Sequence, residues 1–219
     1  MSTRAAAGPL FLGSGTSGRL AVMGVAELPL TFGVPADRFA TLVAAGPTAG
    51  RAAITVSEDD SGAAPSAVAA TGIGRSDAVI GLAASGTAPF VVAGMQAASQ
   101  AGAWTCGMAN NPATPVLTSA DLGILLDTGP EILTGSTRLK AATAQKLALN
   151  RITTAALVRS GAVQSNLMVN VVAANETLRS RCVRAVREVT AANQEEAIAV
   201  LEATGWRTVA AIKEIGAAC

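Results

Sequence analysis

The chain has 219 residues, of which 50% are hydrophobic and 14% are charged, and its formal net charge is +1. This length and apolar content are enough to bury a substantial core. The near-zero net charge excludes the broad basic surface with which proteins bind nucleic acid or anionic membranes. Residues 78–120 carry no charge, but polar residues and prolines interrupt that stretch, so we expect buried parallel strands there and no membrane-spanning helix.

Three cysteines, Cys106, Cys182 and Cys219, lie far apart in the sequence. An odd and dispersed set fits a reducing compartment and indicates neither a disulfide framework nor a metal cluster. The first residues lack the basic region, apolar stretch and cleavage site of an export signal. We therefore expect a cytoplasmic protein without a bound metal or cofactor.

Short apolar segments alternate with amphipathic ones along most of the chain. The apolar segments predict strands at 9–13, 40–45, 77–83, 103–108 and 121–126. The amphipathic segments predict helices at 17–27, 48–56, 64–71, 88–101 and 136–159. This alternation predicts an α/β fold, namely a doubly wound, Rossmann-like parallel sheet of five strands covered by helices.

The pattern changes from residue 175 onward. Three amphipathic helices are predicted in NETLRSRCVRAVREVT, NQEEAIAVLEATG and WRTVAAIKEIG, each with apolar positions at the helical period. We expect one α/β domain over residues 1–174 and a small helical C-terminal region over 175–219.

The first predicted strand runs into GSGTSG at 13–18, which matches G-x-G-x-x-G. A dinucleotide site would need an acidic residue at the end of the second strand, which instead ends in Ala44-Ala45-Gly46, and a P-loop would need Gly-Lys-Ser/Thr. The loop is distinguished by its hydroxyl groups, which can bind phosphate oxygens together with backbone amides. A simple helix N-cap with a tight turn is the alternative interpretation.

Two further segments repeat this hydroxyl-rich pattern. ASGTAPF at 84–90 follows the third predicted strand, and LTGSTRLKAATAQK at 133–146 opens the longest predicted helix. Ligands of open α/β sheets bind outside the carboxyl ends of the strands. Three such turns at one edge of a sheet predict a single pocket for a small phosphorylated ligand.

Several longer motifs resemble the N-acetylmuramic acid 6-phosphate etherases, which have the sugar isomerase (SIS) fold. The resemblance rests on GSGTSGRL at 13–20, ELPLTFG at 27–33, SEDD at 57–60, GPEILTGSTRLKAATAQKLALN at 129–150 and SNLMVNV at 165–171, in the family's order. The vertebrate glucokinase regulatory protein shares the fold and some of these turns.

The resemblance implies a lyase that removes D-lactate from N-acetylmuramic acid 6-phosphate and leaves N-acetylglucosamine 6-phosphate, in the recycling of cell-wall sugars. The reaction is an elimination from the ring-opened sugar followed by addition of water, and it needs an acid and a base. The chain has no His and no Tyr, so carboxylates are the candidates. The resemblance implies Glu27 as the acid and Glu58 as the second carboxylate, which we assign as the base, although acid runs such as 58–60 are usually solvated.

The same positional match implies contacts to the sugar phosphate. These residues are Ser14, Gly15, Thr16, Ser17, Ser85, Gly86, Thr87, Ser136, Thr137, Arg138 and Lys140. Arg138 could hold a phosphate through two parallel hydrogen bonds, or serve as a surface charge.

Two motifs depart from the family's usual pattern. Gly24 and Ala26 replace an acid and a hydroxyl before Glu27, and the SGTAPF turn lacks the family's Arg. These departures leave two alternatives open, a sugar-phosphate-binding regulator without catalytic activity and a sugar-phosphate isomerase.

The predicted helix at 136–159 has a face formed by Ala142, Leu149, Thr153 and Ala156 in place of a charged stripe. We expect this face to be exposed in the single chain and covered by a second copy. The resemblance implies a homodimer with the pocket at the interface, and we expect Glu58 to be the residue that crosses. The alternative is a monomer whose helical tail covers the same face.

Overall fold

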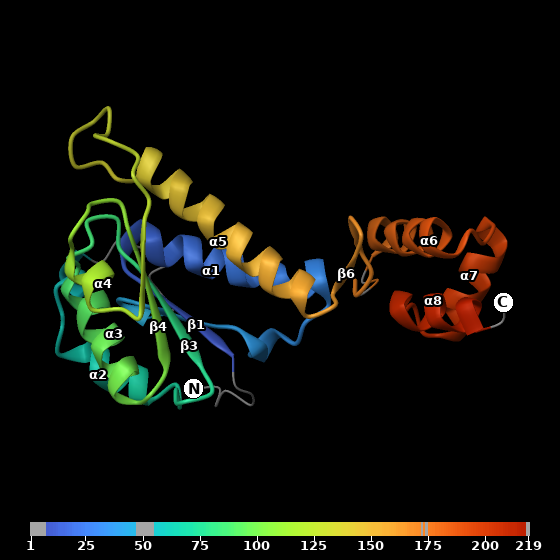
Figure 1. Cartoon of the computed structure of the whole chain (residues 1–219), viewed down its shortest axis with the longest axis horizontal. Coiled ribbons are helices and arrows are strands. Elements are labelled where there is room, and N and C mark those ends of the chain that lie inside the picture. Colours follow the sequence, from blue (N-terminus) through green and yellow to red (C-terminus); the bar gives the residue numbers. More distant parts are fainter. Residues whose placement is uncertain (1–7, 47–54, 172, 174, 218–219) are drawn as a thin grey trace. The chain divides into compact units, whose positions relative to one another are not determined.

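The computed structural model describes residues 8–46, 55–171, 173 and 175–217. Five parallel strands form one sheet in the order β2-β1-β3-β4-β5 (Figure 1). The strands are β1 (Pro9–Gly13), β2 (Ala40–Val43), β3 (Ala78–Leu82), β4 (Trp104–Ala109) and β5 (Leu122–Leu125). The predicted fold class and all five predicted strands are confirmed.

The helices of this part of the chain follow the strands closely. They are α1 (Gly15–Phe32), α2 (Ala63–Ala69), α3 (Pro89–Gln100), α4 (Pro115–Thr118) and α5 (Lys140–Arg159), with 3₁₀ turns η1 (Ala36–Arg38) and η3 (Thr55–Glu58). The predicted helix at 48–56 lies mostly outside the described residues. The single turn of α4 was not predicted, because four residues are too few to show a helical period.

Helices α2, α3 and α4 pack together on the sheet and enclose the main core. Three glycines, Gly81, Gly107 and Gly123, lie side by side in register on β3, β4 and β5. A Cβ atom at these positions would collide with the side chain of Met95 or with backbone carbonyls of α4. The glycine row therefore allows α3 and α4 to approach the sheet closely.

Burial differs from expectation at two places. The leucines of β5 are half exposed, Leu122 at 46% and Leu125 at 43%, because β5 is an edge strand. On α5, the face that we expected to be exposed is mostly buried, with Ala142 at 6%, Leu149 at 3% and Thr153 at 7%. That expectation was wrong, because the single chain already buries these three residues, and of the four only Ala156 is exposed.

The chain divides into two compact units. We call Met1–Ala26 with Asp37–Arg151 the α/β unit, and Glu27–Ala36 with Ile152–Cys219 the C-terminal unit. The predicted boundary at residue 174 falls inside the second unit, and the proposed domain assignment stays a prediction.

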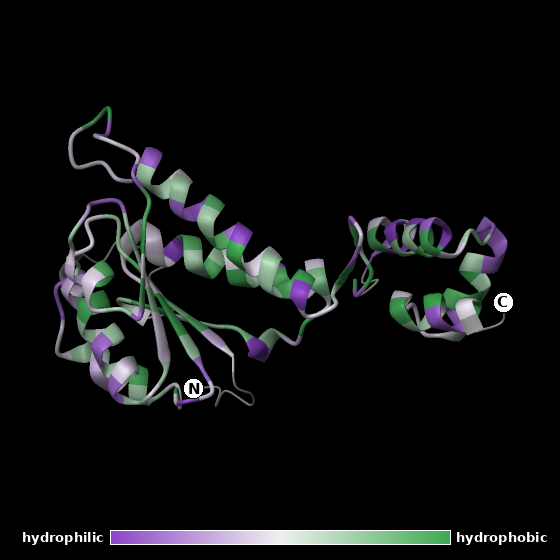
Figure 2. Cartoon of the chain, in the orientation of Figure 1, coloured by the Kyte–Doolittle hydropathy of each residue, from purple (hydrophilic) through white to green (hydrophobic). Residues whose placement is uncertain are grey.

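The C-terminal unit contains a small hairpin and three helices. The elements are β6 (Val163–Gln164), β7 (Leu167–Met168), α6 (Glu176–Thr190), α7 (Gln194–Ala203) and α8 (Thr208–Ala217). Figure 2 shows the hydrophilic and hydrophobic stripes along these helices, whose apolar sides enclose a core around Cys182, Val186 and Leu201. The three predicted helices are confirmed, and the hairpin was not predicted.

Asparagine caps define where two of these helices begin. The Asn175 side chain accepts a hydrogen bond from the Leu178 amide, and Asn193 and Glu196 form a reciprocal capping box. Such caps satisfy amides that would otherwise lack a partner at a helix start.

Candidate functional site

The turn between β1 and α1 joins a buried strand to a helix with exposed polar groups. Ser14 and Ser17 are 7% and 6% exposed, and Thr16 is half-buried. Within the described residues, the amides of Gly15, Thr16 and Ser17 donate no hydrogen bond to the protein. Open amides and hydroxyls at the positive end of a helix dipole form a setting that favours an anion.

Glycines make the geometry of this turn feasible. Gly15 has a φ of +51°, a region that L side chains rarely adopt, and Gly13 and Gly18 lie so close that a Cβ on Gly13 would be 2.8 Å from the Gly18 Cα. The glycine spacing thus allows a tight strand-to-helix turn.

Glu58 reaches this turn from the end of η3. Its Oε1 atom lies where a Cβ on residue 15 would be, so the carboxylate contacts the start of α1 directly. The Glu58 side chain is half-buried, whereas Asp59 and Asp60 are exposed. The structure therefore brings one of the two predicted catalytic carboxylates against the first predicted ligand turn.

The turn after β3 presents its hydroxyls to solvent. The Ser85 hydroxyl accepts hydrogen bonds from the Thr87 amide and the Thr87 hydroxyl, both at 3.2 Å, and both residues are exposed. Gly86 has a φ of +76° and lies against Thr114, which leaves no space for a side chain. Because β1 and β3 are parallel neighbours, their following turns lie at the same edge of the sheet.

An amide network lies at the same edge and was not predicted. The Asn110 amide nitrogen donates to the Leu126 carbonyl at 2.8 Å, and its oxygen accepts a 3.2 Å hydrogen bond from Gln145. Gln145 is fully buried at 0% exposure. This network fixes the chain after β5, and its only sequence signal is a polar pair, Asn110-Asn111, directly after a buried strand.

The third hydroxyl cluster precedes α5 instead of opening it. The helix begins at Lys140, so Ser136, Thr137 and Arg138 lie in the preceding turn, with Thr137 and Arg138 exposed. The prediction that this helix begins at residue 136 was wrong. The helix begins at Lys140, where the Glu131 carboxylate caps its first amides. Its oxygens accept hydrogen bonds from the Lys140 amide at 3.1 Å and the Ala141 amide at 2.9 Å.

These hydrogen bonds change the pKa of the Glu131 carboxyl. The hydrogen bond from the Ala141 amide lowers the pKa of this carboxyl, and the Lys140 amide and charge lower it further, against a smaller opposing effect of desolvation. Glu131 was not singled out from the sequence, because its hydrogen-bond partners are nine and ten residues away. The open amides at the start of α5 are thus already paired with an anion from the chain.

Glu27 lies on α1 within the C-terminal unit, and its side chain is exposed. The other predicted site residues belong to the α/β unit. Within the α/β unit the structure brings Glu58 and the β1 turn together, whereas Glu27 belongs to the other unit.

The parts of the chain that the structure describes contain neither a candidate metal site nor an activated cysteine. In those parts, no group of three His, Cys, Asp or Glu side chains is placed to hold a metal ion. Burial raises the pKa of Cys106 to about 11, so its thiol stays protonated at neutral pH. None of the helices in these same ranges has the length and apolarity needed to cross a bilayer.

Solved structures with the same fold include sugar-phosphate proteins. An Escherichia coli CFT073 protein in complex with A5P matches 74% of this chain and 76% of its own, with a TM-score of 0.53 and 15% identity. The C-terminal domain of glucosamine-fructose-6-phosphate aminotransferase from Francisella tularensis matches 89% of this chain and 48% of its own, with a TM-score of 0.52 and 14% identity. At these identities the likeness shows the fold alone.

Comparison of the sequence with known families identifies a family as well as a fold. The family model for the glucokinase regulatory protein N-terminal SIS domain matches residues 4–99. The N-acetylmuramic acid 6-phosphate etherase of Deinococcus radiodurans is 47% identical over 90% of this chain and 64% of its own length. That of Cronobacter sakazakii is 43% identical over 93% of this chain and 68% of its own, so the chain spans about two thirds of these relatives. The chain belongs to the N-acetylmuramic acid 6-phosphate etherase family.

Proposed function

We propose that this protein cleaves the lactyl ether of N-acetylmuramic acid 6-phosphate and releases D-lactate and N-acetylglucosamine 6-phosphate. The observation that carries the proposal is the 43% identity to an etherase over 93% of the chain. The contact of Glu58 with the β1 turn supports it, because it places a carboxylate beside open amides and hydroxyls.

The proposed reaction begins with the ring-opened sugar held by its phosphate. Glu58 takes the proton from C2, the C3–O bond to lactate breaks, and Glu27 gives a proton to the departing oxygen. Water then adds to the resulting C2=C3 double bond, its hydroxyl at C3 and a proton at C2. The two steps together are a hydrolysis of the ether without any oxidation or reduction, so water is the only co-substrate.

The phosphate is assigned first to the turn at 14–17. Its open amides and buried hydroxyls offer the donor set that a phosphate dianion needs. Ser85, Gly86 and Thr87 are assigned to the sugar. The remaining predicted contacts, Ser136, Thr137, Arg138 and Lys140, would act through side chains, since Glu131 holds the first amides of α5.

We also propose that two copies assemble to complete the site. Large apolar side chains are exposed on β5 and in the segment that follows it, with Ile132 at 84% and Leu133 at 59%. Exposed apolar groups of this kind favour an interface. A two-fold axis would bring a carboxylate of one copy toward the turns of the other, which would give Glu27 a route to the partner's pocket. Glu58 needs no such route, because it already contacts the β1 turn of its own copy.

The reaction is proposed for the cytoplasm, as a step in recycling cell-wall amino sugars. The buried thiols of Cys106 and Cys182 are free, in keeping with a reducing compartment.

The test is release of D-lactate from N-acetylmuramic acid 6-phosphate, measured with a D-lactate dehydrogenase. We expect release by the full chain, and loss of release in Glu27→Gln with binding of the product retained. Asp37→Asn, which neutralises another exposed acid outside the predicted site, is the matched control and should keep full activity. Binding of the product without any lactate release by the dimer would refute the proposal and favour the regulator.

A further inference from the structure

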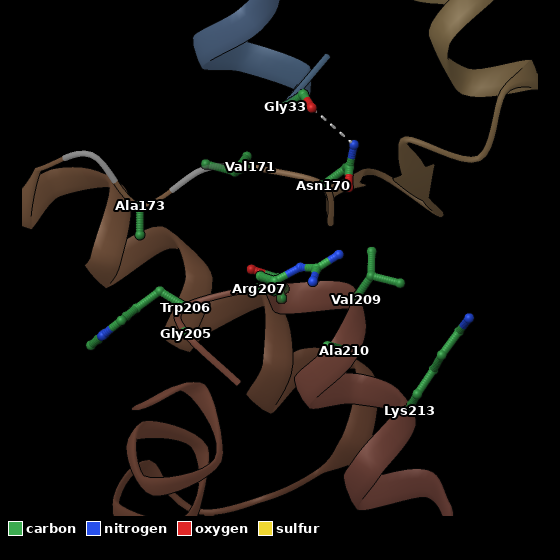
Figure 3. Close-up of a pocket in the computed structure, with 11 residues that line it drawn as sticks. Gly33, Asn170, Val171, Ala173, Gly205, Trp206, Arg207, Val209, Ala210 and Lys213 are labelled. Carbon is green, nitrogen blue, oxygen red and sulfur yellow. Dashed lines mark hydrogen bonds between the residues drawn. The ribbon is translucent and has the colours of Figure 1, made fainter. Parts of the chain in front are cut away.

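A cavity in the C-terminal unit has none of the predicted site residues in its lining. It has a volume of about 530 Å³. Its lining consists of Gly33, three residues before α6 and a segment at the start of α8, namely Asn170, Val171, Ala173, Gly205, Trp206, Arg207, Thr208, Val209, Ala210 and Lys213 (Figure 3). A volume of this size suits a small metabolite.

The charge of the lining has one sign. Arg207 and Lys213 are the charged residues of the lining, and none of the lining residues is acidic. Both cations are exposed and make no ion pair within the described residues. Figure 3 shows the Arg207 side chain between Asn170 and the start of α8, and the Lys213 side chain farther along α8. Unpaired cations beside a cavity favour an anionic ligand.

The start of α8 adds backbone donors. The amides of Val209 and Ala210 donate no hydrogen bond to any acceptor in the described ranges, and the helix extends for ten residues. Their N–H groups and the helix dipole together favour negative charge at this end.

A buried hydroxyl supplies independent evidence for a missing partner. Thr208 lines the cavity, is only 1% exposed, and its Oγ1 atom has no hydrogen-bond partner in the described structure. Buried hydroxyls are rarely left unpaired, because loss of hydration without a new hydrogen bond is unfavourable. A ligand oxygen in the cavity would satisfy it.

The backbone of Trp206, one of the residues that line the cavity, has an uncommon conformation. Trp206 has a φ of +60°, and its ring is stacked by the Arg179 guanidinium at 4.9 Å from the centroid. Non-glycine residues in this region are costly, and such strain concentrates at functional sites. The conformation places Arg207 and Thr208 directly after the turn, at the start of α8.

We infer that this cavity is a second anion site, which binds a phosphate monoester of a small sugar through Arg207, Lys213, the Thr208 hydroxyl and the first amides of α8. Its residues are different from those assigned to the catalytic pocket, and the inference does not depend on that proposal. The phosphoryl group is the recognised chemistry, and the apolar side chains of Val171, Ala173 and Val209 would contact the sugar.

The chain offers a local reporter for this site. It has two tryptophans, Trp104 on β4 and Trp206 in the cavity, so a Trp104→Phe chain emits from Trp206 alone. We would titrate this chain with N-acetylglucosamine 6-phosphate, inorganic phosphate and N-acetylglucosamine. A saturable change in emission is expected with the first two ligands and not with the unphosphorylated sugar.

Variants separate this site from the proposed catalytic pocket. Arg207→Gln with Lys213→Gln should weaken binding at least about tenfold, because charge-assisted hydrogen bonds are lost. Thr208→Val, which keeps the side-chain shape, should weaken it by a smaller factor. Ser17→Ala should leave the Trp206 response unchanged, and so should Lys146→Gln with Arg159→Gln, a matched loss of one Arg and one Lys outside the cavity lining.

Amide NMR signals of Thr208, Val209 and Ala210 provide a second measurement if emission is insensitive. They should shift with phosphate in the parent chain and not in the Arg207→Gln, Lys213→Gln variant. Unmoved signals at phosphate concentrations that saturate the protein elsewhere, or equal shifts in that variant and the parent, would overturn the proposal.

Discussion

The starts of α1 and α5 look alike in the sequence, since each follows a cluster of serine, threonine and glycine, but they differ in the structure. At α5, the Glu131 carboxylate accepts hydrogen bonds from the Lys140 and Ala141 amides. At α1, the first amides stay unpaired within the described residues, and the Glu58 carboxylate only contacts Gly15. A helix start is available to a ligand anion only where the chain has not already supplied one.

The two helix starts imply different roles for the carboxylates of Glu131 and Glu58. Glu131 determines where α5 begins, so we regard it as structural. Glu58 keeps its oxygens free of hydrogen bonds among the described residues, so it can act on a ligand bound at the neighbouring amides. The start of α8, with its acid-free cavity, resembles α1 in this respect.

The largest effect is expected from Glu58→Gln. Removal of the C2 base should lower D-lactate release by about 100-fold or more, while product binding is kept. Asp59→Asn changes the adjacent exposed acid and should leave release unchanged. Equal loss in both variants would mean that the acid run contributes through its total charge and that Glu58 has no special role.

A second change perturbs the α1 turn through its backbone. Gly15→Ala should destabilise the fold by about 1–3 kcal/mol, since it combines strain at a positive φ with a clash against Glu58. Urea denaturation followed by circular dichroism measures the change. Gly24→Ala on the same helix is the control and should stabilise by roughly 0.5–1 kcal/mol, because nothing lies within 4 Å of its added methyl group. Equal stability in both alanine variants would argue against the close contact at Gly15.

A third change tests the carboxylate cap of α5. Glu131→Ala should lower the urea midpoint and make the start of α5 responsive to added anions, so that inorganic phosphate stabilises this variant more than the parent. A variant that loses stability without gaining any response to phosphate would show that an open helix start does not suffice for anion binding.

The pH dependence of stability gives a smaller effect with a defined sign. Folding lowers the pKa of Glu131 below its ordinary value of 4.5, so this carboxyl stabilises the fold fully above that value. The stabilisation is lost as the pH falls through the lower folded pKa. The urea midpoints of the parent and Glu131→Gln should therefore converge in acid, and a constant difference between them at all pH values would contradict the assignment.

The sequence predicted the five strands and most helices because buried parallel strands and amphipathic helices leave strong local patterns. The turn at 13–18 was likewise predictable, since its glycines and hydroxyls are adjacent in sequence. The expectation that Glu58 crosses to a partner copy was wrong, because its carboxylate contacts Gly15 of its own chain.

Features that depend on distant partners could not be predicted. The cap from Glu131 to α5 and the hydrogen bond from Gln145 to Asn110 require knowledge of how the chain returns on itself. The apolar stripe on α5 was recognised but assigned to the wrong partner, because periodicity gives the face of a helix and not what covers it.

The most direct test of the central claim follows backbone amides of the whole chain by NMR while N-acetylglucosamine 6-phosphate is added. The account predicts saturable shifts at Gly15, Thr16 and Ser17, and no direct binding at the Lys140 and Ala141 amides, which Glu131 already holds. Shifts centred on Lys140 and Ala141, with the α1 amides unmoved, would contradict it and would place the phosphate at α5.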